Sequence, residues 1–520
     1  MKIKRIISAL FAKSVVLSAM VLSSCYKDLS TEATVTFPEI VIENSGEPIN
    51  IGYGETLVMD PKVRQEGYGT GELTYHWEFD FRPNNKNDRL DLGNELHLEY
   101  IVGNTPSNTP YNLTLTVTNP KLGISAISNW SVYVSNSLGE GLLVAYTRDD
   151  GATSDLDLVC AENITYDAPE SPQYVRNLYS LSNDGAVIDG EVRAMLVRVS
   201  SNGAVYNDPL VLVGTDKELL GLSPLNYKVD RRNGDLFYNF SGDKFEVQTL
   251  FNFGSYVSGA VVNNCFYANI CHIDNMYSKT GYPVIKSDIF TADNVSYAAL
   301  NQGWVGVFDP NEGKFATATV LTALSGAFMF AGFDDSFTYS LVGGKCLGAG
   351  CLKDQRNSFV VRDTDGKDHW CIMKTDNLPT EMNSYDLTLP DVDNAVSFAF
   401  CDNSDIFYYA TPTTIYATVL SGNVTVTQPL TWSPDSADER ITMLKHYRQA
   451  WYGTQQLSAS YEFAIPTNRA QIIIVTHNDK TGEGKIYLRG YNVSTGKFTY
   501  SSNGKFDGFG RITAIATTMR

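Results

Sequence analysis

The sequence is short of basic residues, and this shortage restricts the possible partners. Its 520 residues include 40 Lys and Arg against 58 Asp and Glu, a formal net charge of −18. Proteins that hold a nucleic-acid backbone do so with a basic surface, so we expect no nucleic-acid partner. The chain is not disordered either, because 43% of its residues are hydrophobic and 12% are aromatic, enough to build a core.

Several motifs of enzymes and metal sites are also missing. The chain contains no C-x-x-C, no H-E-x-x-H, no G-x-S-x-G and no phosphate-binding glycine loop. Its six histidines are scattered, at positions 76, 97, 272, 369, 446 and 477. We therefore expect neither a resident cofactor nor a metal site, and the sequence favours a binding protein over an enzyme.

Cysteines are few, and an odd number of them remains after the N-terminal segment. Seven remain when Cys25 is set aside, so they cannot all pair within one chain. Two interpretations stay open: the cysteines are buried free thiols, or one disulfide joins Cys346 to Cys351.

Long apolar runs are absent after the N-terminus, where no window has the 18 uncharged apolar residues of a membrane-spanning helix. The first 24 residues combine early Lys and Arg residues with a short apolar stretch, Ser14–Leu22, as signal peptides do. Leu22-Ser23-Ser24-Cys25 resembles a bacterial lipobox, which predicts cleavage after residue 24, lipidation of Cys25 and a flexible tether over residues 25–36. The alternative is an ordinary secretory signal followed by a chance cysteine. Cleavage would remove four bases and no acid, leaving 36 bases against 58 acids, a net charge of −22.

Two groups of acidic residues invite a functional interpretation. Asp363–Asp368 alternates carboxylates like a calcium-binding loop. Such a loop has Gly at its sixth and Glu at its twelfth position, whereas here, counted from Asp363, Gly366 is fourth and Thr375 is twelfth. We therefore expect a type I′ hairpin turn. Asp149, Asp150, Asp155 and Asp157 are candidates for loop ligands or for a pair of carboxylates in acid/base chemistry.

Residues 37–136 predict a β-sandwich. Leu73–Phe79 and Tyr111–Asn119 each alternate apolar and polar residues, so that one face of each strand enters a core that includes Trp77. These two segments resemble those of PKD domains, which have an immunoglobulin-like architecture and serve as spacers or protein-binding modules. The family's Gly-Asp-Gly after the first segment is replaced here by Asp80-Phe81-Arg82-Pro83.

Residues 138–520 predict a β-propeller of about seven blades. Val305–Phe315 repeats as Leu488–Phe498, each a strand, a turn with glycine and a return strand beginning on an aromatic residue. Related turns recur at glycines 151, 203, 242, 366 and 422. The alternating C-terminal stretch Arg511–Thr517 is expected to pair with residues 142–146 and close the ring. The chain is thus expected to be all-β.

One short helix is expected within this β region. Asp438–Arg448 follows Ser436, has acids in its first turn, and spaces Ile441, Leu444 and Tyr447 three residues apart. The aromatic and amide residues that follow suit sugar stacking or peptide capture, which makes Tyr447, Arg448, Trp451 and Tyr452 the candidate ligand-binding residues. The alternative is that Trp451 only fixes the helix to the propeller.

The lipobox, the PKD-like segment and the propeller-like remainder together resemble the PKD-like family lipoproteins of Bacteroidota. Such proteins commonly accompany SusC/SusD-type outer-membrane importers, and the resemblance implies an accessory subunit that binds or presents an oligopeptide or glycan. Lys27-Asp28 resembles an export signal, so the protein is expected on the outer membrane, lipid-anchored and facing the exterior. The alternatives are a surface glycoside hydrolase, lyase or peptidase with its site in the propeller funnel, and a structural or adhesive envelope protein.

Overall fold

The computed structural model divides into two compact units, residues 1–135 and 136–520, and each is described by itself. The structure describes residues 37–518 except for 82–87, 105–108, 136–139, 149–150, 167, 199–209, 238–239, 241–243, 253–256, 271–277, 280–290, 298–303, 321–327, 333–339, 377, 450–464 and 500–503. No helix in this described part is long and apolar enough to cross a membrane.

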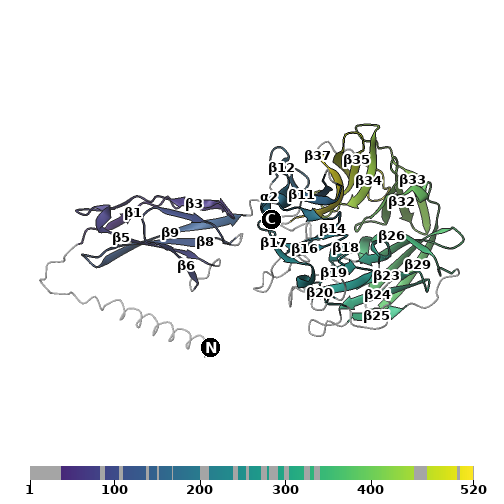
Figure 1. The fold of residues 1–520 in the computed structure, drawn as a ribbon, viewed down its shortest axis with the longest axis horizontal. Coiled ribbons are helices and arrows are strands. Elements are labelled where there is room, and N and C mark those ends of the chain that lie inside the picture. Colours follow the sequence, from purple (N-terminus) through teal and green to yellow (C-terminus); the bar gives the residue numbers. More distant parts are fainter. Residues whose placement is uncertain are drawn as a thin grey trace, which may run out of the picture. The chain divides into compact units, whose positions relative to one another are not determined.

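The first unit is built around a five-stranded sheet (Figure 1). In spatial order its strands are β2 (Ile49–Gly52), β9 (Ile124–Ser135), β8 (Tyr111–Asn119), β5 (Thr74–Asp80) and β6 (Arg89–Gly93). Two smaller pairs accompany it, β1 (Ile40–Ile42) with β4 (Val63–Gln65) and β3 (Thr56–Met59) with β7 (Leu98–Ile101). Residues of all these strands share one hydrophobic core.

The two alternating segments of this unit pair with each other as β5 and β8. Trp77 lies opposite Leu115 and Phe79 lies opposite Leu113, and all four side chains are buried. The ring of Trp77 packs at a tilt against the ring of Trp130 on β9, with 5.5 Å between their centroids, and its indole nitrogen donates a hydrogen bond to a backbone carbonyl. The prediction that Trp77 belongs to the core is therefore confirmed.

The second unit contains seven sheets among its described residues. The first sheet combines β10 (Leu142–Thr147), β11 (Thr153–Cys160), β12 (Gln173–Val175) and β13 (Ile188–Asp189) with the C-terminal β38 (Arg511–Thr517). Each of the other six is a four-stranded antiparallel meander in chain order. They begin at β14 (Val192–Arg198), β18 (Val247–Asn252), β22 (Val295–Tyr297), β26 (Lys345–Cys351), β30 (Ser397–Phe400) and β34 (Glu439–His446), and end at β17 (Val229–Arg232), β21 (Ser278–Lys279), β25 (Phe328–Gly332), β29 (Leu378–Leu387), β33 (Val424–Pro429) and β37 (Lys505–Phe509).

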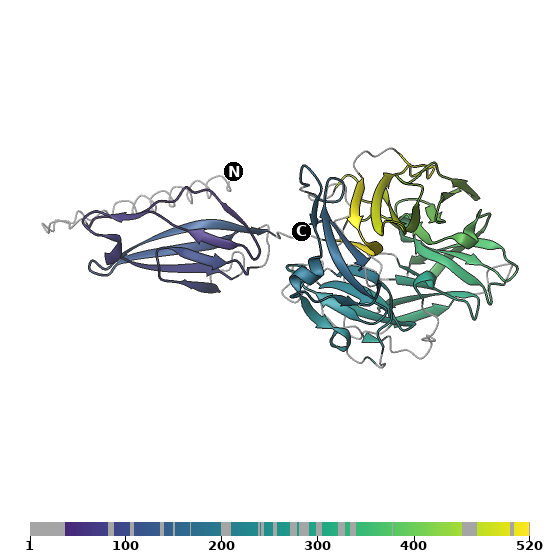
Figure 2. The same cartoon turned by 45° about the horizontal axis from the view of Figure 1, so that its top comes forward.

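The sheets follow one another around a common centre (Figures 1 and 2). The innermost strands of successive sheets pack side by side: β14 contacts both β38 and β18, and β30 contacts both β26 and β34. The C-terminal strand β38 supplies the innermost position of the first sheet, where Leu142 pairs with Thr517 and Ala145 with Ala514. This confirms the expected closure of the ring. The second unit is therefore all-β and propeller-like.

Glycine turns join neighbouring strands as the repeat predicts. Val305–Phe315 forms the hairpin of β23 (Trp304–Asp309) and β24 (Lys314–Val320), and Gly313 and its counterpart Gly496 both have positive φ. Glycines 151, 366 and 422 also have positive φ at turns, whereas positions 203 and 242 lie outside the described residues.

The turn at Asp363–Lys367 is a hairpin, but not of type I′. It joins β27 (Asn357–Arg362) to β28 (Asp368–Asp376), and Gly366 is its only residue with positive φ, whereas type I′ needs two. Asp363 accepts hydrogen bonds from the backbone N–H groups of Asp365 and Lys367. Its carboxylate therefore stabilises a five-residue loop.

The helix expected over Asp438–Arg448 is wrong, because this segment contains strand β34. A β-bulge between Ile441 and Met443 adds one residue to the strand, so Ile441 and Leu444 face the same core cluster despite their odd spacing. Tyr447 faces the opposite cluster. The bulge thus reproduces, within a strand, part of a spacing that is typical of a helix.

The cysteines of the described part are free thiols at positions 160, 265, 346, 351, 371 and 401. Cys346 is the second residue and Cys351 the last residue of strand β26, which holds them apart and excludes the disulfide interpretation. Cys25 and Cys271 lie outside the described residues.

Candidate functional site

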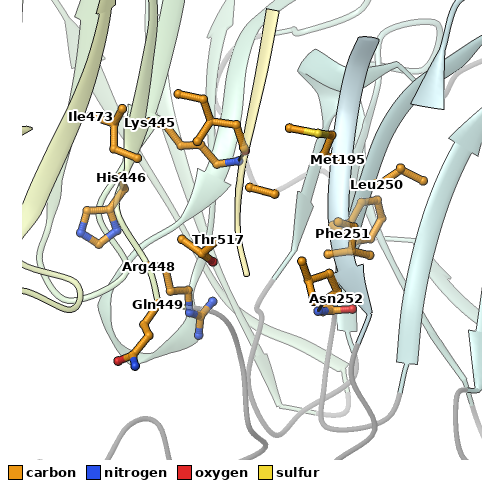
Figure 3. A pocket seen from close by; sticks show the side chains of 14 residues that line it. Met195, Leu250, Phe251, Asn252, Lys445, His446, Arg448, Gln449, Ile473 and Thr517 are labelled. Carbon is orange, nitrogen blue, oxygen red and sulfur yellow. Dashed lines mark hydrogen bonds between the residues drawn. The ribbon is translucent and has the colours of Figure 1, made fainter. Parts of the chain in front are cut away.

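A cavity of about 150 Å³ lies among the innermost strands of the second unit. Its walls come from β14, β18, β34, β35 (Gln471–Asn478) and β38, with residues just after β34. Figure 3 shows Met195, Leu250, Phe251 and Asn252 on one side and Lys445, His446, Arg448 and Gln449 on the other. The cavity therefore has one largely apolar wall and one wall rich in nitrogen groups.

Lys445 is the charged residue that β34 directs toward β38. Its Nζ donates a hydrogen bond to the backbone carbonyl of Ile515 at 2.5 Å, and its side chain is exposed to the cavity. The surrounding protein keeps the ammonium group from bulk water and lowers the pKa of Lys445 to about 8. An ammonium group has three donors, and among the described residues this one has no carboxylate partner.

Arg448 lies beside a buried carboxylate that is already engaged. Asp402 accepts a hydrogen bond of 2.8 Å from the side chain of Arg469, which also binds the Asp402 backbone carbonyl at 2.6 Å. Arg448 approaches the same carboxylate only to 3.6 Å. Burial by itself would raise the pKa of Asp402, but Arg448, His446 and Arg469 outweigh it and hold that pKa at about 2. Within the described part of the chain, the Nη2 of Arg448 has no hydrogen-bond partner.

His446 holds this cluster in place. Its Nε2 lies 3.0 Å from the hydroxyl of Tyr491 and 3.2 Å from the backbone carbonyl of Arg469, and its Nδ1 lies 3.6 Å from Asp402. Burial lowers the pKa of His446, so the neutral ring is favoured near pH 7. His446 is thus neutral, and Asp402 is paired with Arg469. Lys445 and Arg448 therefore give the cavity an excess of positive charge.

Gln449 fixes the chain where it leaves β34. Its side-chain amide donates to Glu140 at 2.5 Å and accepts from the backbone N–H of Ile465 at 3.2 Å. Its own backbone N–H donates to Asn468 at 2.9 Å. These bonds position the backbone next to Arg448, so the guanidinium group extends from a supported segment.

The predicted ligand-binding residues have different locations. Tyr447 is buried in a hydrophobic cluster with Leu142, Val144 and Ile473, whereas Arg448 lines the cavity. Trp451, Tyr452 and the predicted lipidation site Cys25 lie outside the described residues. Sequence reasoning missed Lys445, because a helix was expected there and strand alternation was not considered.

The acidic candidates Asp155 and Asp157 are buried and form ion pairs with half-buried arginines. Asp155 pairs with Arg148 at 3.0 Å and Asp157 pairs with Arg176 at 2.7 Å. Asp157 also accepts the backbone N–H of Asn177, just before helix α2 (Leu178–Ser182). These contacts give the two carboxylates a structural role, while Asp149 and Asp150 lie outside the described residues. In the part of the chain that is described, no three His, Cys, Asp or Glu side chains gather as a metal site would require.

The fold and the cavity define an all-β, propeller-like protein with a small cationic cavity among the innermost strands of its ring. No family model and no curated protein matches the sequence. Among solved structures, the chain is similar to a quinonprotein alcohol dehydrogenase-like protein from Bacteroides thetaiotaomicron, with 13% identity, a TM-score of 0.41, and coverage of 92% of this chain and 98% of that one. It is also similar to apo AztD from Citrobacter koseri, with 10% identity, a TM-score of 0.37, and coverage of 86% and 98%. For Sqt1 from Chaetomium thermophilum the identity is 11%, the TM-score 0.39, and the coverage 70% and 88%. These likenesses are too distant to carry a function to this chain.

Proposed function

We propose that this protein is a lipid-anchored surface protein of the outer membrane, a PKD-like lipoprotein that acts as an accessory subunit of a SusC/SusD-type nutrient importer. In this role it binds or presents an oligopeptide or a glycan. The lipobox-like Leu22–Cys25 supports the anchor. The central cavity carries the binding role, because Lys445 and Arg448 meet there with hydrogen-bond donors that the described protein does not use.

The two units have separate tasks in this proposal. The first is a PKD-like sandwich that spaces the second from the anchor. The second is a propeller of seven blades, one for each described sheet, with β38 closing the ring in the first blade. A closed ring holds side chains from distant parts of the sequence at one rigid centre, which suits ligand binding.

Purification of the full chain from its native membrane in mild detergent tests the importer role. We expect a TonB-dependent transporter to co-purify, and mass spectrometry of the complex to detect the transporter and any bound ligand. Recovery of this chain only as a free monomer would contradict the role.

The anchor is tested by metabolic labelling with a fatty acid. Cys25→Ala should abolish the label, because the thiol is the predicted acceptor of the lipid, whereas Cys265→Ala should retain it. Labelled Cys25→Ala protein would show that the predicted anchor is wrong.

A further inference from the structure

Lys445 and Arg448 differ from several cations of the second unit that are paired with carboxylates. Arg176 pairs with Asp157 at 2.7 Å, Lys485 with Glu439 at 2.7 Å, and Arg469 with Asp402 at 2.8 Å. Among the described residues, Lys445 Nζ donates only to a backbone carbonyl, and the Nη2 of Arg448 has no hydrogen-bond partner. A buried donor such as the Nη2 of Arg448 costs free energy when it has no acceptor.

Both cations line the same cavity, and the remaining lining adds no negative charge. The residues from β14, β18, β35 and β38 are apolar except for Asn252 and Thr517. Asp402 approaches Arg448 only to 3.6 Å and is itself bound by Arg469. An anion that enters the cavity would therefore meet unused donors from two cations and no competing carboxylate in its lining.

The volume of the cavity and its apolar wall restrict which anions can bind. A cavity of about 150 Å³ is smaller than the ~300–1,000 Å³ of typical small-molecule pockets, so it has room for one end group of a longer ligand. Met195 and Leu250 form an apolar surface opposite the cations. A group with an anionic side and an apolar side fits both walls.

We propose that the central cavity captures a terminal carboxylate of the ligand, held between Lys445 Nζ and the Arg448 guanidinium group, with the apolar part of the same end residue against Met195 and Leu250. This inference rests on the proposed binding function and names the chemical group that the site recognises. A planar guanidinium group and an ammonium group together suit the two oxygens of one carboxylate.

Titration calorimetry on the full lipidated chain in detergent tests the proposal with two matched pairs of probes. The first pair is acetyl-Ala-Ala-Leu with a free carboxylate and the same peptide as its amide. The second is a uronic-acid trisaccharide and its methyl ester. We expect one acid to bind at least tenfold more tightly than its neutral partner, and the pair that discriminates identifies the source as peptide or sugar. Equal affinities within both pairs would overturn the proposal.

Variants link the carboxylate preference to the two cations. Lys445→Met and Arg448→Gln should each weaken binding of the preferred acid at least tenfold and leave the neutral probe unchanged. Lys480→Met is the matched control, because Lys480 is an exposed lysine paired with Asp438 on the surface, and it should bind like the wild type. If either cation variant fails to fold, Lys445→Arg serves in its place and should retain acid binding. Unchanged acid affinity in folded Lys445→Met and Arg448→Gln would overturn the proposal.

The pH dependence gives a readout that a purely structural role would not change. Lys445 has a pKa of about 8, so its charge, and with it acid binding, should be present at pH 7 and decline above about pH 8. Arg448 and His446 are the other titratable side chains in the lining, and because burial lowers the pKa of His446, its ring is neutral above pH 7. The lining residues from β14, β18, β35 and β38 carry no titratable group. Lys445→Arg should remove the decline, and a decline of the same size in this variant would count against the proposal.

The outcome can be separated from that of the proposed importer role. A chain that co-purifies with a transporter but shows no carboxylate preference refutes only this inference. A chain that binds the acid but isolates as a free monomer refutes the importer role and leaves the carboxylate site standing.

Discussion

At the scale of single residues, Glu439 is a charged side chain that is fully buried in the second unit. Its side chain is fully buried and meets Lys485 at 2.7 Å, the Tyr487 hydroxyl at 2.8 Å and the Thr476 hydroxyl at 2.9 Å. Burial by itself would raise the pKa of Glu439, but these three partners outweigh it and lower that pKa. The carboxylate is thus satisfied by β35 and β36 (Glu483–Gly490) together.

Glu439→Gln should destabilise the second unit by about 3–5 kcal/mol, because it leaves the ammonium group of Lys485 poorly matched in a protected site. Asp438→Asn is the control. Asp438 is the neighbouring acid, yet it pairs with Lys480 on the surface, where an ion pair contributes about 0–1 kcal/mol. Urea unfolding of the full chain measures both changes. Equal destabilisation by the two variants would contradict the structural role of Glu439.

At the scale of elements, the repeated glycine turns are not equivalent. Gly313 and Gly422 both have positive φ, but a Cβ at Gly313 would collide with the backbone of Leu341 and Val342, whereas one at Gly422 would meet nothing. Backbone strain of about 1–2 kcal/mol is expected from alanine at either position. The turn at Gly313 is additionally restricted by a neighbouring segment.

Gly313→Ala should therefore destabilise the protein by about 1–3 kcal/mol more than Gly422→Ala, since the collision adds an overpacking cost to the shared strain. Parallel thermal unfolding scans of the two variants provide the comparison. If both variants lower the melting temperature equally, the close approach of Val342 does not restrict this turn.

Strand β34 shows why one element could not be assigned correctly from its own residues. The spacing of three between Ile441 and Leu444 on one face is shared by a helix and by a strand with a bulge. The choice depends on β35, which pairs with this segment along its length. Once it is a strand, alternation directs Lys445 toward β38 and His446 toward Asp402, and this creates the candidate site.

At the scale of the whole molecule, closure of the ring depends on the C-terminal strand. Besides its pairing with β10, β38 anchors Thr518, which bonds reciprocally with Gly141 through backbone and hydroxyl contacts at 2.9 Å. Its carbonyl at Ile515 also accepts the bond from Lys445. Loss of β38 would leave the innermost edge of β10 unpaired and remove one wall of the cavity.

Deletion of residues 511–520 should consequently abolish the cooperative thermal transition of the second unit and leave that of the first unit in place. Differential scanning calorimetry of the full chain and of the truncated chain resolves the two transitions. A chain shortened by only residues 519–520 keeps β38 and should unfold like the wild type. An unchanged second transition after the longer deletion would show that closure by β38 is dispensable.

The sequence by itself determined the β-rich character, the alternating strands around Trp77, the glycine hairpins and the closing strand, because these features depend on local alternation and turn chemistry. Tertiary structure alone decided that β34 is a strand, that Cys346 and Cys351 stay apart, and that Lys445 and Arg448 share a cavity with Met195. These outcomes depend on contacts between residues far apart in the chain. A ring brings the first strands of separate sheets to one centre, and no local pattern records which of their side chains will meet there.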